Sequence, residues 1–290
     1  MTVYVAVDFH AREQTVSYCN LADGEIHRRK LRHQHDDVRA FYQQFTGAVI
    51  VAFEASGYSA WFEQMLAELG HTVWLGNPAE IRRKAPRRQK NDRRDADLML
   101  DLLLKGDFPR VHGFSEESRT VLRQLRYRHK LVKVRTIAKN SLQAIGINAG
   151  LPLQRRLLTA PGIAQLQALS LSPVLTQQRD EWLQLIGSMN ERIATVEAQL
   201  QQRAKDDAAI ALLRTHPGIG LLTSLALRYT LLPTSRFSTT RQVTAYVGLD
   251  CMEDQSAERR GWAVLVKPDR NCCVFCLMKR GTRPRGTIRN

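Results

Sequence analysis

Short apolar runs alternate with amphipathic segments over the first third of the chain. Runs rich in Val, Ile, Tyr and Phe are typical of strands, whereas apolar residues spaced three and four apart predict helices. The turn Ala22-Asp23-Gly24 separates two of the strands. The pattern predicts strands at residues 3–9, 15–20, 25–31, 48–54 and 71–75, and helices at 36–46, at 60–69 and from Asp92 onward.

Longer helices are predicted in the middle of the chain, on either side of a connector at 150–178 that contains Pro152, Pro161 and Pro173. The first runs from Ser115 to Asn148, with an apolar stripe at Leu122, Leu125, Leu131, Val134, Leu142 and Ile145. The second carries an a/d seam about three heptads long, formed by Trp182, Ile186, Met189, Ile193, Val196 and Leu200. The seam either packs against the chain's own helices or forms a self-association coiled coil.

Near the C-terminus, two predicted helices are joined by Pro217-Gly218-Ile219-Gly220. Gly218 and Gly220 would let a phosphate backbone approach closely, and the amides at the start of the second helix would face it. A Pro-Gly pair also ends helices without any ligand, so simple helix termination is the alternative.

Composition adds a strong positive charge to this pattern. The 290 residues carry a formal net charge of +15 and a pI of about 10.1, which favours nucleic acid or an anionic surface as partner. No run is apolar and long enough to cross a membrane, and the N-terminus has no charged-then-apolar leader. We therefore expect a cytoplasmic protein without a membrane partner. The five cysteines do not pair evidently, so no disulfide framework is expected.

The positive charge is concentrated in two segments. After Glu117 the helix ending at Asn148 has no acidic residue, which favours phosphate contact over a solvated helix face. The other segment leads into the helix at Asp92, and Pro86 predicts a loop there; a solvated loop is the alternative. The candidate nucleic-acid contacts are Arg82, Arg83, Lys84, Arg87, Arg88, Lys90, Arg123, Arg126, Arg128, Lys130 and Lys133.

Four acidic residues stand where a fold could bring them together. Asp8 and Glu54 each end an apolar strand, and Asp92 and Asp95 are three apart at the start of a helix, so both can project from one face. The order β-β-β-α-β-α-β-α is typical of a ribonuclease-H-like sheet, in which acids at neighbouring strand ends meet a helical acid. A divalent metal ion would make such clustering of like charges tolerable. The alternative is a helix-capping Asp and two strand ends that happen to be acidic.

Several spaced motifs resemble the insertion sequence 110 family of transposases. They are Asp8 after an apolar strand, Glu54-Ala55-Ser56-Gly57-Tyr58, Gly70-His71-Thr72-Val73, Asn77-Pro78 and Lys90-Asn91-Asp92-Arg93-Arg94-Asp95-Ala96. Ser56 and Asn91 replace the threonines that the family usually has, but no carboxylate is lost. The resemblance implies a RuvC-like domain with a DEDD carboxylate set at Asp8, Glu54, Asp92 and Asp95, which would bind Mg²⁺ or Mn²⁺.

The resemblance also implies a separate C-terminal domain with a nucleophilic serine, which Ser256 matches. Ala257 stands where the family usually has Gly. The implied protein is a DNA transposase or recombinase of a bacterial or archaeal mobile element. It would form a seryl–DNA intermediate, be guided by a structured bridge RNA and act as a dimer or tetramer. The alternatives are a metal-dependent junction nuclease that uses water and a catalytically inactive nucleic-acid-binding remnant.

Four regions are predicted along the chain. Residues 1–112 form a ribonuclease-H/RuvC-like α/β domain, and residues 113–205 hold the basic helix, the connector and the coiled coil. Residues 206–260 form a mainly α-helical serine-bearing domain with a helix-hairpin-helix-like element. Residues 261–290 form an altered tail.

The tail leads to a prediction about the coding DNA, because the family pattern stops after Arg260. With permitted synonymous codons, reading from the third base of the Arg260 codon gives a Gly-rich turn, a Ser-Lys-any-Gly element and an apolar helix. The family usually has this pattern there. We therefore predict a one-base shift near this codon, weak or absent recombination, and a loosely ordered tail from about Gly261. If the coding DNA allows no one-base shift that restores the pattern, the hypothesis is wrong.

Overall fold

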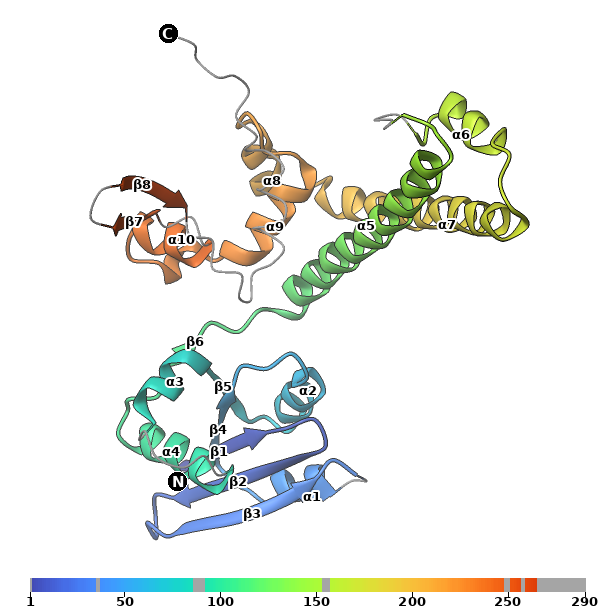
Figure 1. Cartoon of the computed structure of the whole chain (residues 1–290). Helices are drawn as coiled ribbons and strands as arrows, with labels where there is room; N and C mark the ends of the chain where they lie inside the picture. Colours follow the sequence, from blue (N-terminus) through green and yellow to red (C-terminus); the bar gives the residue numbers. More distant parts are fainter. Residues whose placement is uncertain are drawn as a thin grey trace. The chain divides into compact units, whose positions relative to one another are not determined.

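The chain divides into two compact units, Met1–Gly113 and Phe114–Asn290 (Figure 1). The computed structural model describes residues 2–34, 37–85, 92–152, 157–247, 251–256 and 259–264. At 92, 93, 251–256 and 259–264 the description covers only the backbone elements. Each unit is described by itself below.

The first unit is built on a six-stranded mixed sheet with the order β3-β2-β1-β4-β5-β6. β1 runs parallel to β4, and β4 runs parallel to β5, whereas the other neighbouring strands are antiparallel. The strands are β1 Thr2–Phe9, β2 Glu13–Asn20, β3 Ile26–Arg32, β4 Ala48–Glu54, β5 Thr72–Gly76 and β6 Arg110–Val111. The five longer strands confirm the sequence prediction, and β6 was not predicted.

In the described part of the first unit, four helices cover the two faces of this sheet (Figure 1). They are α1 Asp37–Gln43, α2 Ala60–Glu68, α3 Pro78–Lys84 and α4 Asp92–Leu104. Because side chains alternate along a strand, Val5 and Val7 of β1 join the apolar core under α1 and α2, whereas Ala6 joins the core under α3 and α4. The first unit is therefore a three-layered α/β domain with a separate apolar core on each face of the sheet.

Helix α3 corrects the predicted basic loop. Asn77 caps it by accepting from the backbone N–H of Ala79 at 3.0 Å, and Pro78 occupies the first turn, where proline is favoured. Arg82, Arg83 and Lys84 consequently form the last turn of a helix. Gly76 lies just before α3, and a Cβ there would come within 2.6 Å of Ile81 Cδ1, so a larger residue would force the side chains of Ile81 and Phe108 to shift.

The second unit is dominated by the pair of long helices α5 and α7, which lie side by side (Figure 1). Smaller helices and a two-stranded hairpin complete it. Its elements are α5 Glu116–Asn148, α6 Ala160–Gln167, α7 Pro173–Ala204, α8 Ala208–Arg214, α9 Leu221–Leu231, a 3₁₀ turn at Thr234–Arg236, α10 Thr240–Val247, β7 Cys251–Ser256 and β8 Arg259–Val264. The predicted long helix from Ser115 is confirmed, with Ser115 as its N-cap.

The predicted connector at 150–178 is wrong for much of its length, because it contains α6 and the start of α7. Pro161 and Pro173 lie in the first turns of these helices, where the absent proline N–H costs no intrahelical hydrogen bond. The a/d seam of α7 packs within the chain. Met189, Ile193, Val196 and Leu200 join a core with residues of α5, and Ile186 is buried with Leu142. The seam is thus occupied by the chain's own helices.

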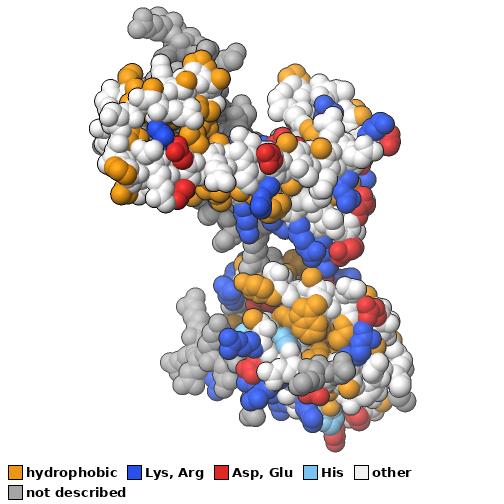
Figure 2. Space-filling model, turned by 90° about the vertical axis from the view of Figure 1, so that its right-hand side faces the viewer, with side chains coloured by type: hydrophobic (Ala, Val, Ile, Leu, Met, Phe, Trp, Pro, Cys, Tyr) orange, Lys and Arg blue, Asp and Glu red, His pale blue; other side chains and the backbone are white. Residues whose placement is uncertain are grey.

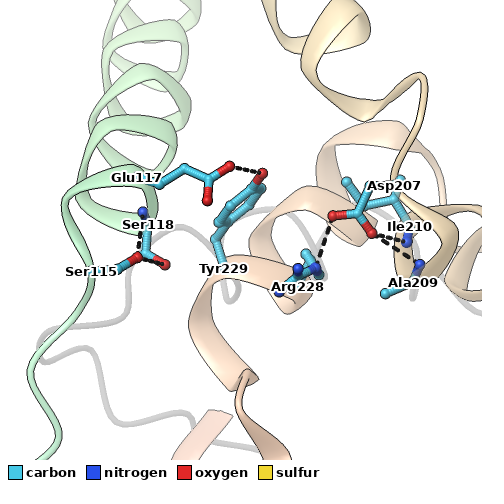
Figure 3. Close-up of polar contacts among 8 residues, drawn as sticks. All are labelled: Ser115, Glu117, Ser118, Asp207, Ala209, Ile210, Arg228 and Tyr229. Atoms are coloured by element: carbon cyan, nitrogen blue, oxygen red, sulfur yellow. Dashed lines mark hydrogen bonds and ion pairs between the residues drawn. The ribbon is translucent and has the colours of Figure 1, made fainter.

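Polar contacts attach α8 and α9 to each other and α9 to the start of α5 (Figure 3). The hydroxyl of Tyr229 donates to Glu117 Oε1 at 3.0 Å, and Arg228 Nε donates to Asp207 Oδ2 at 2.9 Å. Asp207 Oδ1 also accepts from the first amides of α8. Burial opposes ionisation of Asp207, but its hydrogen bonds with Ile210 and Arg228 outweigh burial and lower its pKa. These contacts fix the start of α8 and the end of α9.

The C-terminal hairpin differs from the sequence prediction. The backbone of residues 261–264 belongs to β8, where Gly261 is opposite Asp254, so the expected loose tail does not begin at Gly261. Residues 265–290 lie outside the described residues. Among the helices of the described part of the chain, none is long and apolar enough to cross a membrane.

Candidate carboxylate site and nucleic-acid surfaces

Asp8 and Glu54 lie next to each other at one edge of the central sheet. Val7 of β1 is registered with Phe53 of the parallel strand β4, so Asp8 and Glu54 follow one position later on both strands. Each acid is two residues beyond an alanine, Ala6 or Ala52, that packs under α4. By the alternation of side chains, both carboxylates are therefore on the α4 face of the sheet. Asp8 is 17% exposed and Glu54 39% exposed.

A third acid, Asp97, positions α4 over this edge, a role that was not predicted from the sequence. Ser17 Oγ of β2 donates to Asp97 Oδ1 at 2.7 Å, and Arg28 Nε of β3 donates to the same oxygen at 2.9 Å. Ser17 is registered opposite Ala6, and Asp8 follows Ala6 by two residues, or about 7 Å along the strand. These contacts hold the first turns of α4 close to Asp8.

The two acids of α4 proposed from sequence are placed by this anchoring. Asp95 is partly buried and stands one turn before Met99, a residue of the stripe that packs on the sheet, so Asp95 faces the sheet. Asp92 is the first residue of α4, but its side chain lies outside the described residues. Among the described side chains, no three His, Cys, Asp or Glu residues are close enough to hold a metal ion.

Basic groups lie beside the two strand-end acids. His10 Nε2 is 3.0 Å from Asp8 Oδ2, and an Arg82 amino nitrogen is 3.6 Å from Glu54 Oε1. The Arg82 guanidinium offsets part of the negative charge at this edge. Carboxylate oxygens are the hard ligands that Mg²⁺ and Mn²⁺ prefer, so the donor chemistry of Asp8, Glu54 and Asp95 fits such an ion.

The candidate nucleic-acid contacts on α5 separate into two sets. Arg128 is 13% exposed and forms an ion pair with Glu197 of α7 at 2.6 Å, so it attaches the two helices to each other. Arg123, Arg126, Lys130 and Lys133 are exposed, and their spacing of three and four places them on a single face. We name these four residues the outer basic face. Arg128 no longer belongs with them as a candidate nucleic-acid contact.

The remaining candidate residues are distributed over the chain. Arg82, Arg83 and Lys84 are exposed at the end of α3, whereas Arg87, Arg88 and Lys90 lie outside the described residues. Gly218 adopts a φ of +87° between α8 and α9, and Gly220 is the N-cap of α9 without a side-chain cap. Ser256 ends β7 in the second unit, opposite Arg259, and its side chain is not described.

Comparisons with known proteins agree with this geometry. A transposase model of the IS110 DEDD type matches residues 5–145, and the model of the transposase IS116/IS110/IS902 family matches residues 210–267. The first match contains the four proposed acids, and the second contains Ser256.

Relatives named as transposases have similar sequences. The "Probable family 20 transposase" of Pseudomonas aeruginosa is 29% identical over 77% of this chain and 66% of its own length. The transposase for insertion sequence element IS1328 of Yersinia enterocolitica is 26% identical over 69% and 60%. The transposase for element IS1111A of Coxiella burnetii is 25% identical over 69% and 56%. The chain thus spans less than two thirds of the length of these relatives.

The mixed sheet with acids at adjacent parallel strand ends, crossed by an acid-bearing helix, is consistent with a ribonuclease-H-like DEDD domain. Together with the two family matches, this defines the class of the protein. The chain belongs to the IS110 family of transposases. A DEDD domain indicates that a divalent metal ion is needed.

Proposed function

We propose that this protein is a DNA transposase, a recombinase that cuts and rejoins DNA strands for an insertion sequence. The observation that carries the proposal is the placement of Asp8 and Glu54 side by side on the face covered by α4. Asp97 anchors that helix near Asp8 and so presents Asp95 to the same edge. The two family matches support the same activity.

We further propose that Asp8, Glu54, Asp92 and Asp95 supply oxygen ligands for Mg²⁺, with Mn²⁺ as an alternative. When bound, the ion would polarise a phosphoryl oxygen and lower the pKa of the attacking group. Arg82, beside Glu54, would orient the DNA by pairing with a phosphate. The basic segment from Arg82 to Lys90 would guide the phosphate backbone toward the acids.

Ser256 is the proposed nucleophile. Its Oγ would attack the phosphorus of a phosphodiester, the bond from phosphorus to the leaving sugar oxygen would break, and that oxygen would take up a proton. A serine hydroxyl is a weak nucleophile unless its pKa is lowered or a base takes up its proton. A nuclease that uses water is the second candidate, because the carboxylate edge lies entirely within the first unit. In that case Ser256 has no chemical role.

Two surfaces of the second unit are proposed to bind nucleic acid. The outer basic face of α5 would contact phosphates, and the turn through Gly218 and Gly220 would present the amides of α9 to a DNA backbone. A structured guide RNA is proposed as a second partner, since cations contact RNA and DNA phosphates alike. A dimer or tetramer is proposed because several strands must be cut, and its contact surface would not be the occupied α7 seam.

The contribution of the outer basic face is predicted from the salt dependence of binding. Replacing Arg126 and Lys130 by Ala should make the slope of log affinity against log salt shallower by about 0.7 to 0.9 per lost contact. The slope is measured with labelled DNA and RNA between low and physiological salt. The matched control is Arg192→Ala with Arg203→Ala, which removes two exposed cations from α7. If the slope of log affinity against log salt is the same in the two double variants, the outer basic face contacts solvent and not nucleic acid.

One experiment tests the proposed function as a whole. The full chain is incubated with labelled DNA and Mg²⁺ or with a chelator, and the products are separated under denaturing conditions. Metal-dependent strand cleavage with a protein–DNA adduct supports the recombinase, and cleavage without an adduct supports the water-using nuclease. DNA that is bound equally well with and without Mg²⁺ and stays uncut indicates an inactive nucleic-acid binder.

A further inference from the structure

Two aromatic side chains are exposed beside the carboxylate edge. Tyr58, in the loop after β4, is 75% exposed, and Trp61, in the first turn of α2, is 44% exposed. At 75% exposure, Tyr58 forgoes most of the stabilisation that burial of its ring would give, whereas Trp61 keeps about half of it. Packing of the core therefore does not account for Tyr58.

Trp61 packs against the rings of His33 and Phe9. Its ring centroid lies 5.0 Å from that of His33 and 5.9 Å from that of Phe9, and Phe9 and His33 are themselves 4.9 Å apart. Burial lowers the pKa of His33, so its ring is neutral at physiological pH and packs like an apolar ring. Trp61 is thus held in place with part of its surface open.

These aromatic residues are close in the chain to the proposed metal ligands. Phe9 directly follows Asp8, and its ring joins the core under α1 and α2, on the face of the sheet opposite the carboxylates. Tyr58 follows Glu54 by four residues, so their Cα atoms are at most about 14 Å apart. Because both groups lie at the same ends of β1 and β4, a nucleotide that neighbours one with its phosphate at the carboxylates can pass these strand ends and place its base on the rings.

The surrounding charge favours nucleic acid over an apolar protein partner. On the face drawn in Figure 2, hydrophobic side chains gather on the first unit, and Lys and Arg side chains lie around them. Arg12 is exposed in the loop after Phe9, and Arg82 lies beside Glu54. Aromatic rings combined with cations along a backbone path are the usual means by which proteins hold unpaired nucleotides.

We propose that Tyr58 and Trp61 form a stacking platform for an unpaired base of the nucleic acid at the carboxylate site. The proposal rests on the proposed function and adds a feature of the substrate, namely a base that is not paired next to the phosphate to be cut. The platform would stabilise locally opened DNA there, since unstacking a base from a duplex costs free energy that a new stacking contact offsets.

The test compares two single-stranded DNA probes in a chelator, so that neither is cut. One is a short oligothymidylate, and the other is the same length of abasic sugar-phosphate chain. Tyr58→Ala in the full chain should weaken binding of the oligothymidylate about 5- to 10-fold, the low end for one stacked base. Binding of the abasic probe should not change. Tyr58→Phe should bind both probes like the unmodified protein, because it keeps the ring.

The matched control is Leu21→Ala, which removes a 55% exposed apolar side chain at the opposite edge of the same sheet. It should leave binding of both probes unchanged. An equal loss of affinity for both probes in Tyr58→Ala, or no loss for either, overturns the platform while the proposed function stands. If the unmodified protein binds neither probe, both proposals fail. Trp61→Ala is a secondary variant, because Trp61 also packs on Phe62.

Discussion

An Asp95→Asn variant is expected to bind nucleic acid as tightly as the unmodified protein and to lose metal-dependent cleavage by more than about a hundredfold. Removing even an outer partner of a metal ligand costs up to about a hundredfold, so replacing a ligand should cost more. Binding should persist because the change makes the site less negative. Cleavage is measured as the initial rate on labelled DNA across a range of Mg²⁺ concentrations, and binding is measured in chelator.

The matched control for this prediction is Asp101→Asn, on the same helix. Asp101 is exposed and pairs with Lys105 at 2.7 Å, so its change removes an equal charge from α4 without touching the sheet edge. It should cleave at the unmodified rate. Full cleavage by Asp95→Asn and by the equivalent Glu54→Gln would rule out the four-carboxylate model, whatever the affinity for DNA.

The sheet could be predicted from the sequence because local pattern and tertiary structure agree there. β1 and β4 are apolar runs that end in an acid, and both are buried on two faces, which produces continuous apolar sequence. The order of the elements then indicated which strand ends meet. Asp8 and Glu54 could accordingly be proposed as a pair before their registry was known.

The helices that were not predicted are marked by single residues at their first turns and not by a periodic apolar pattern. Helix α3 is short and begins at the Asn77-Pro78 cap, so its basic last turn read as a loop. Pro161 and Pro173 stand in the segment predicted as a connector, although proline fits the first turn of a helix. In each case the residue that marks a helix start also occurs in connectors.

Contacts between residues that are far apart in the chain could not be predicted from the sequence either. Asp97 stands two residues after Asp95, and only its contacts with Ser17 and Arg28 show that it anchors α4. Arg128 looked like its basic neighbours, but its partner Glu197 is distant along the chain. Exposed Tyr58 was noticed only as part of a motif. A charge or ring acquires its role from neighbours that local sequence does not contain.

The last prediction concerns Ser256 as nucleophile. With Mg²⁺ and DNA, the full chain should form an adduct that survives boiling in detergent, and Ser256→Ala should abolish it, since alanine has no oxygen to bond to phosphorus. Ser235→Ala, an exposed serine of the same unit, is the matched control and should retain the adduct. Mass spectrometry of the adduct should place the nucleotide on Ser256. Unimpaired cleavage by Ser256→Ala would favour water as the nucleophile.

The predicted frameshift makes the yield of this adduct informative. Ser256 lies only a few residues before Arg260, the codon at which a shifted reading frame is predicted, and the match to the IS116/IS110/IS902 family model extends to residue 267. If a one-base shift replaced an apolar helix that should pack behind the serine, the loop would be held loosely, and catalysis falls steeply when a nucleophile is displaced by as little as about 1 Å. A chain with the frame restored at the Arg260 codon should therefore give more adduct than the present chain. Its own Ser256→Ala variant should give none, which separates a repaired site from adventitious cross-linking.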